Sequence, residues 1–174
     1  LLDLEALEEK PTNLIPGFAE RIQQMFPTMV SHRCSEGVEG RFFRRVEQGT
    51  WMGHVIEHIA LELQTLAGME TGFGRTRSSS KTGVYHVVFS YVEEEVGKQT
   101  AKTAVEIAQH LIDGSEFDVE SFIQELREIR ERVRLGPSTG SIVEEAIHRN
   151  IPWIRLNKNS LVQLGYGVNQ RRIQ

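Results

Sequence analysis

The sequence predicts an α+β fold, in which a small mixed or antiparallel sheet is packed by several helices. Two kinds of segment carry this prediction. Several segments, among them 50–67 and 93–112, place apolar residues at the spacing of a helix, and one segment, 83–92, is β-branched and aromatic almost throughout. The 174 residues are 39% hydrophobic and 25% charged, which is the composition of a globular domain of ordinary size.

The first fifty residues predict short elements that proline and glycine separate. Residues 1–10 are expected to form the end of a strand and a short helical turn, and a helix over 17–25 is stopped by Pro27. A second helix, over 41–47, has an apolar side and a basic side. The apolar side contains Phe42, Phe43 and Val46, and the basic side, which we expect to face outward, contains Arg41, Arg44 and Arg45.

The helix over 50–67 carries the most specific local motif, H-x-x-E-H, formed by His54, Glu57 and His58. This order is the inverse of the common H-E-x-x-H zinc motif. Residues four apart lie one turn apart on the same helix face, so both imidazoles can reach one point. We therefore predict His54 and His58 as metal ligands. Glu57 lies near the same rim and is predicted to be the general base that deprotonates the attacking water.

A polar stripe without any metal is the alternative interpretation of this motif. Glu62 continues the row of His54 and His58, and the apolar stripe beside it contains Val55, Ile59, Leu63 and Leu66. The histidine row therefore borders the core rather than bulk water, which favours a site. Thr50 is the expected N-cap of the helix, and Gly68 its end.

A segment rich in glycine, arginine and serine, 72–80, is predicted to be a loop. It is either a surface connection or a clamp for an anion, in which Arg75 and Arg77 bind carboxylates beside the histidine row. The strand predicted over 83–92 follows it, and its continuous apolar character predicts a central position in the sheet.

An acidic triplet, Glu93-Glu94-Glu95, opens the helix that continues to about residue 112. Acidic residues are favoured in a first helical turn by the helix dipole, which is sufficient reason for the triplet. Alternatively, one member supplies a third metal ligand. Glu94 is the member that we favour for this role, and Glu93 and Glu95 stay open.

The C-terminal third predicts a further helix and then a change of domain. Asp118 is the expected cap of a helix that ends near Arg134, and the glycine- and proline-containing segment 136–140 marks a boundary. A helix over 141–150 and strands at 152–156 and 161–167 follow. We therefore predict one domain over 1–134 and a second segment over 135–174, which is too short to bury a core of its own.

Charge and cysteine content limit the classes of function. The formal net charge of −4 and the pI of about 5.9 argue against a nucleic-acid-binding protein, and no segment has the length of a membrane span. Cys34 is the single cysteine, which fits a reducing, cytoplasmic setting, and its place near a histidine makes a nucleophile a minor alternative. The chain begins without Met and ends abruptly, as expected of a piece of a longer protein.

Several segments together resemble the cyanophycin synthetases. Three segments resemble the N-terminal part of that family: Glu9-Lys10-Pro11-Thr12-Asn13, Gly53-His54-Val55-Ile56-Glu57-His58 and Gly72-Phe73-Gly74-Arg75-Thr76-Arg77. Four further segments resemble the start of its ATP-grasp domain: Leu135-Gly136-Pro137-Ser138-Thr139, Ile151-Pro152-Trp153, Val162-Gln163-Leu164-Gly165-Tyr166-Gly167 and Gln170-Arg171-Arg172-Ile173-Gln174. The resemblance runs from end to end of the chain.

The resemblance implies a ligase that polymerises aspartate and arginine with ATP and Mg²⁺. Its product, cyanophycin, is a polyaspartate backbone with arginine on the side-chain carboxylates. The resemblance implies that residues 1–134 are an N-terminal domain and that 135–174 contain the first helix and strands of an ATP-grasp domain. A Mur-ligase-like domain follows in the family, and a homo-oligomer is expected. No ligase residue can be assigned in this chain.

For the N-terminal domain, the resemblance implies binding of the polymer and, in some members, metal-dependent hydrolysis of the polymer to primers. It supports His54 and His58 as Zn²⁺ ligands and Glu57 as the base. We further expect acidic side chains to contact the guanidinium groups of the polymer, namely Glu62, Glu93 and Glu95. Arg75 and Arg77 are expected to contact its carboxylates. The alternative is a non-catalytic binding or assembly module, in which the histidine row is structural.

Overall fold

The computed structural model describes residues 1–32, 34 and 37–174 and confirms the predicted α+β fold. Its contacts divide the chain into two compact units, Leu1–Arg127 and Glu128–Gln174, so the division falls inside one helix, α5 (Val119–Val133). The predicted domain boundary at 134/135 stays a prediction. Each unit has one three-stranded sheet, in which all neighbouring strands are antiparallel.

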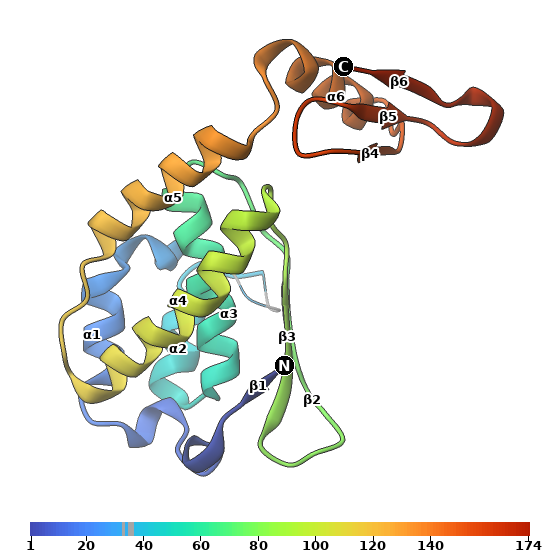
Figure 1. The fold of residues 1–174 in the computed structure, drawn as a ribbon. Coiled ribbons are helices and arrows are strands. Elements are labelled where there is room, and N and C mark those ends of the chain that lie inside the picture. Colours follow the sequence, from blue (N-terminus) through green and yellow to red (C-terminus); the bar gives the residue numbers. More distant parts are fainter. Residues whose placement is uncertain (33, 35–36) are drawn as a thin grey trace. The chain divides into compact units, whose positions relative to one another are not determined.

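The first unit is built around α3 (Met52–Leu66), which packs against α4 (Glu94–Asp113) on one side and against the sheet on the other (Figure 1). Two shorter helices, α1 (Phe18–Met25) and α2 (Arg41–Gln48), complete the helical layer. Twelve residues of α3 are buried, the glutamate and the second histidine of the motif among them. The largest fully buried side chains of this unit include Phe18, Phe26, Phe42, Ile59, Leu63, Ile107, Leu111 and Leu126.

The sheet of this unit has the strand order β1-β3-β2, formed by Leu2–Asp3, Val84–Phe89 and Gly74–Ser78. The central position predicted for the 83–92 segment is therefore confirmed. The strand is not buried along its whole length, because His86 and Val88 are exposed while Val84 is buried. Helix α3 packs on one face of β3, and among the described residues the side chains of the strand alternate between more buried and more exposed positions.

The prediction of a loop over 72–80 is wrong, because Gly74–Ser78 form the edge strand β2. The composition of this segment is that of a loop, but backbone pairing with β3 holds it in an extended conformation. Glycines lie at two points where α3 closely approaches this strand. A Cβ at Gly74 would lie 2.5 Å from Glu57 Oε1, and a Cβ at Gly53 would lie 3.0 Å from the Thr76 methyl carbon. The helix and the strand are therefore in close contact at the motif.

The predicted N-cap of α3 is also wrong. Trp51 occupies the cap position without a side-chain cap, and the Thr50 hydroxyl lies 3.2 Å from His54 Nδ1 instead. Thr50 is itself fixed by Thr12, whose hydroxyl accepts from the Thr50 N–H at 3.0 Å and donates to the Val46 carbonyl at 2.7 Å. The residue that the sequence suggests as a helix cap thus orients a histidine of the motif.

The second unit contains α6 (Pro137–His148) and a sheet in the order β4-β5-β6, formed by Trp153–Arg155, Val162–Leu164 and Arg171–Ile173. Arg155 ties this unit together by donating to the carbonyls of Val133, Lys158 and Asn159. Short 3₁₀ helices lie at Glu5–Leu7, Thr12–Leu14, Pro27–Ser31 and Gly167–Asn169. Within the described ranges, no helix combines the length and the hydrophobicity needed to cross a bilayer.

Candidate functional site

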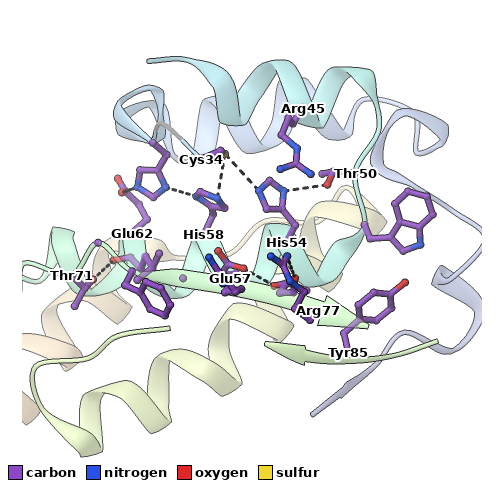
Figure 2. A pocket seen from close by; sticks show the side chains of 18 of the residues that line it. Cys34, Arg45, Thr50, His54, Glu57, His58, Glu62, Thr71, Arg77 and Tyr85 are labelled. Atoms are coloured by element: carbon purple, nitrogen blue, oxygen red, sulfur yellow. Dashed lines mark hydrogen bonds and ion pairs between the residues drawn. The ribbon is translucent and has the colours of Figure 1, made fainter. Parts of the chain in front are cut away.

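A pocket of about 940 Å³ opens on the motif-bearing side of α3. Its walls are the segment that contains Ser31, His32 and Cys34, the C-terminal part of α2, the histidine face of α3 and the edge strand β2 with the residues before it (Figure 2). All of these belong to the first unit. The volume is sufficient for several residues of an extended chain.

Three potential metal ligands converge in this pocket. Cys34 Sγ lies 3.6 Å from His54 Nε2 and 3.4 Å from His58 Nε2 (Figure 2). Zn–N bonds of about 2.0–2.1 Å and Zn–S bonds of about 2.3 Å place two ligands of a tetrahedral zinc ion about 3.5 Å apart. The donor set and its spacing therefore fit zinc. Among the described residues, these three form the group of His, Cys, Asp and Glu side chains that could hold an ion.

The other ring nitrogens of the two histidines are hydrogen-bonded away from this group. His54 Nδ1 pairs with the Thr50 hydroxyl, and His58 Nδ1 lies 2.8 Å from His32 Nδ1. His32 Nε2 in turn lies 2.7 Å from Glu62 Oε2, and the Thr28 hydroxyl donates to the other Glu62 oxygen.

One assignment of protons satisfies this chain of contacts. The His58 Nδ1–H donates to His32 Nδ1, and the His32 Nε2–H donates to Glu62. With the His54 Nδ1–H donating to the Thr50 hydroxyl as well, both Nε2 lone pairs of the motif point at Cys34. In many metal sites an outer carboxylate orients a ligand histidine by a hydrogen bond. Here the carboxylate of Glu62 orients His58 indirectly, through the imidazole of His32.

The buried surroundings keep both motif histidines neutral. Burial, assisted by the positive charge of Arg45, lowers the pKa of His54 to about 4. Burial also lowers the pKa of His58 to about 2, assisted by His54, His32 and Arg45. The fully buried Phe42 ring packs on His58 with a centroid distance of 4.6 Å. Neutral, immobilised imidazoles are the form that binds a metal.

Glu57 lies on the side of the pocket that faces β2. Its side chain is buried, and its Oε2 accepts a hydrogen bond from the Thr76 hydroxyl at 2.6 Å. Burial raises the pKa of Glu57, although the Thr76 hydrogen bond and the charges of Arg45, Arg77 and Arg75 oppose that rise. A carboxyl group with these neighbours is held in one orientation and retains basicity.

Three arginines place positive charge around Glu57. Arg75 and Arg77 line the pocket from the exposed edge strand, and their role as a carboxylate clamp stays a prediction. Arg45, expected to face outward, is half-buried and lines the pocket next to His54 (Figure 2). Within the described part of the chain, no carboxylate forms an ion pair with Arg45. The pocket thus presents cationic groups to whatever enters it.

The acidic residues predicted for the site have other surroundings. The triplet Glu93, Glu94 and Glu95 does not line this pocket. Glu94 is exposed in the first turn of α4 and forms an ion pair with Lys98, so the structure does not bring it to the histidine pair. Glu62 is only 2% exposed, and both of its oxygens are engaged by His32 and Thr28. Its predicted contact with guanidinium groups stays a prediction. In the structure its carboxylate accepts hydrogen bonds from His32 and Thr28 instead.

Sequence reasoning did not predict the place in the site of four residues: His32, Cys34, Arg45 and Thr76. Cys34 was considered only as a nucleophile and not as a metal ligand. A signal was present for the first two, because a histidine and a cysteine two positions apart are both common zinc ligands. Nothing in the sequence indicates that this pair meets α3, since the contact depends on the path of the chain between α1 and α2.

We expect loss of the Glu62 carboxylate to weaken metal binding. Glu62→Leu leaves the His32 Nε2–H without its acceptor, so His58 loses its orientation, and we expect roughly a 10- to 100-fold weaker affinity for zinc. Glu62→Gln keeps an acceptor oxygen and should lie between this variant and the wild type. Competition with a chromophoric chelator measures the affinity, with Lys98→Gln as a surface control. Equal zinc affinities for the wild type and the three variants would show that the contacts from Glu62 through His32 to His58 do not orient the ligand.

Comparisons with known proteins agree with the sequence motifs. Residues 1–113 match the family model described as cyanophycin synthase-like N-terminal domain. The chain is 49% identical over 176 residues to a cyanophycin synthetase of Geminocystis herdmanii and 48% identical to one of Synechocystis sp.. These matches cover 99% of this chain but only 20% of each relative, so the chain spans about a fifth of the length of those proteins.

Proposed function

This chain belongs to the cyanophycin synthase-like N-terminal domain family, and on that basis we propose that it is the N-terminal part of a cyanophycin synthetase. The complete protein would be an ATP-dependent ligase that joins aspartate and arginine. In this proposal, residues 1–134 form the N-terminal domain and 135–174 the start of an ATP-grasp domain. The ATP, the Mg²⁺ and the Mur-ligase-like domain belong to the rest of a cytoplasmic, homo-oligomeric enzyme.

For the fragment itself, we propose that the pocket on α3 binds the polymer and hydrolyses it to primers. Cys34, His54 and His58 would hold zinc, which supplies Lewis-acid activation of water and polarisation of the carbonyl. Glu57 accepts the proton of the attacking water as the new C–O bond forms. It then delivers that proton to the amine as the C–N bond breaks. The observation that carries this proposal is the convergence of three donor atoms at zinc-ligand spacing beside Glu57.

The charged residues around the pocket suggest how the polymer is held. Every repeat of the polymer carries a carboxylate and a guanidinium group. Arg75 and Arg77 would bind carboxylates, and Arg45 adds a cation next to His54. Glu93 and Glu95 stay candidates for guanidinium contacts outside the pocket.

The proposal is tested by incubating the purified 174-residue chain with cyanophycin. We expect release of short fragments, loss of that release when a chelator removes the metal, and its recovery when Zn²⁺ is restored. Elemental analysis of each sample gives the metal content. Intact polymer at full zinc occupancy would exclude hydrolysis.

That last outcome would favour the second candidate function, a non-catalytic module that captures the polymer. The observation in its favour is the cationic lining of the pocket, which needs no metal to attract carboxylates. Binding of the polymer by chelator-treated protein, without cleavage under any condition, is the result that identifies this module.

A further inference from the structure

The edge strand β2 forms one wall of the pocket along its whole length. The lining residues run without interruption from Thr71 to Ser78 and lie opposite the histidine face of α3 (Figure 2). Within the described residues, β2 pairs with β3 alone, so its other side carries backbone groups that no strand uses. An unpaired edge is a template for a further strand.

The register identifies which backbone groups face this open side. The Ser90 N–H donates to the Phe73 carbonyl at 2.8 Å, and the Ser79 N–H donates to the Val84 carbonyl at 2.8 Å. Hydrogen-bonded pairs alternate with non-hydrogen-bonded pairs in an antiparallel ladder, so Arg75 and Arg77 also bond to β3.

The residues between them, Gly74, Thr76 and Ser78, therefore point their N–H and C=O groups away from β3. One contact supports this assignment. Arg77 Nη1 reaches its neighbour's carbonyl, Thr76 O, at 3.1 Å, which places that oxygen on the open side. That carbonyl has a second lone pair, so it can still accept from another chain.

The side chains of β2 divide between the two faces of the sheet. Thr76 points to α3, where it bonds Glu57, and Gly74 leaves room for the same carboxylate. Arg75 and Arg77 alternate with these residues and are exposed. A strand added beside β2 would thus set alternate side groups next to the arginines and would run its backbone along the wall that faces His54 and His58.

The charge on this edge selects the occupant. Two arginines on the strand repel a second copy of the same edge, and they attract a chain that carries carboxylates. We propose that β2 binds an extended, carboxylate-bearing polypeptide by strand addition, with Gly74, Thr76 and Ser78 making the backbone hydrogen bonds. This inference rests on the proposed function for the identity of that polypeptide, the polyaspartate backbone of the polymer.

Amide exchange tests the register directly. The probe is a synthetic segment of the polymer with four repeats, added to the zinc-loaded 174-residue chain with Glu57→Gln so that cleavage does not consume it. We expect the amides of Gly74, Thr76 and Ser78 to exchange at least about tenfold more slowly with the probe, and those of Arg75 and Arg77 to be unchanged because β3 already protects them. An oligolysine of equal length should protect none.

A proline variant provides an independent test. Ser78→Pro removes a backbone donor on the open side and leaves the ladder with β3 intact, which edge strands tolerate. We expect its dissociation constant for the probe to rise about five- to tenfold. Ser78→Ala keeps the donor and should bind within about twofold of the wild type.

The outcomes separate this inference from the hydrolysis. Unaltered exchange at all three outward amides, or equal protection of outward and inward amides, overturns strand addition even if the wild-type chain cleaves the polymer. Alternating protection in a chain that never cleaves supports strand addition and excludes only the hydrolysis.

Discussion

Glu57→Gln is expected to reduce polymer cleavage by roughly 10²- to 10⁴-fold, because the amide cannot accept the proton of the attacking water. The substitution keeps the size of the side chain, and the amide oxygen can still accept the hydrogen bond from Thr76. We therefore expect zinc affinity and the free energy of unfolding to change little. Fragment release is measured by quantifying new amino termini at equal zinc occupancy.

The matched control is Glu94→Gln, an equivalent change of charge on an exposed helix turn. It should leave cleavage unchanged. If Glu57→Gln cleaves at the wild-type rate with zinc bound, Glu57 is not the base, and its bond to Thr76 is then a structural link between α3 and β2.

The sequence predicts those parts of the site that lie on one element. His54, Glu57 and His58 are fixed relative to one another by the pitch of α3, so their spacing alone indicates a shared rim. The pocket contains all three, as the motif suggests. The strand β3 was also predictable, because its β-branched and aromatic residues favour an extended chain whatever its neighbours are.

The missed features depend on contacts between segments far apart in the sequence. Cys34 contacts the histidines of α3 although it is far from them in the sequence. Its φ of 50° is a left-handed conformation, which the sequence around it does not predict. Arg45 was assigned to the outer side of α2 by helical periodicity. The long side chain of Arg45 lines the pocket instead. Helical periodicity predicts which side of a helix faces the core, but it does not predict where a pocket lies.

The strand β2 shows how tertiary context overrides composition. Gly74 and Ser78 have low strand propensity, and the segment around them has the composition of a loop. Its order comes from the ladder with β3 and from the hydrogen bonds that Thr76 makes with Glu57 and with the Gly53 carbonyl. The same close approach accounts for the glycine that precedes the motif, Gly53, and for the glycine that begins the strand, Gly74.

The identity of the third metal ligand is the point on which sequence and structure differ most, and two variants decide it. The sequence favours Glu94, whereas the structure brings Cys34 to the histidine pair. Zinc held by four ligands contributes about 10–16 kcal/mol in small zinc domains, so one ligand is worth on the order of 3 kcal/mol. We therefore expect Cys34→Ala to weaken zinc binding by about a hundredfold or more, and Glu94→Gln to leave it unchanged.

Cobalt substitution provides a readout that does not depend on activity. A Co²⁺-loaded wild-type chain should show the intense near-ultraviolet absorption of a thiolate–cobalt bond, and Cys34→Ala should lack it while Glu94→Gln retains it. The same pair of variants tests a nucleophilic cysteine. In that case Cys34→Ala would lose cleavage with its zinc affinity intact. If the Co²⁺-loaded wild-type chain lacks this thiolate band and Glu94→Gln binds the metal more weakly, the assignment returns to the glutamate, because Cys34 is the chain's single source of a thiolate.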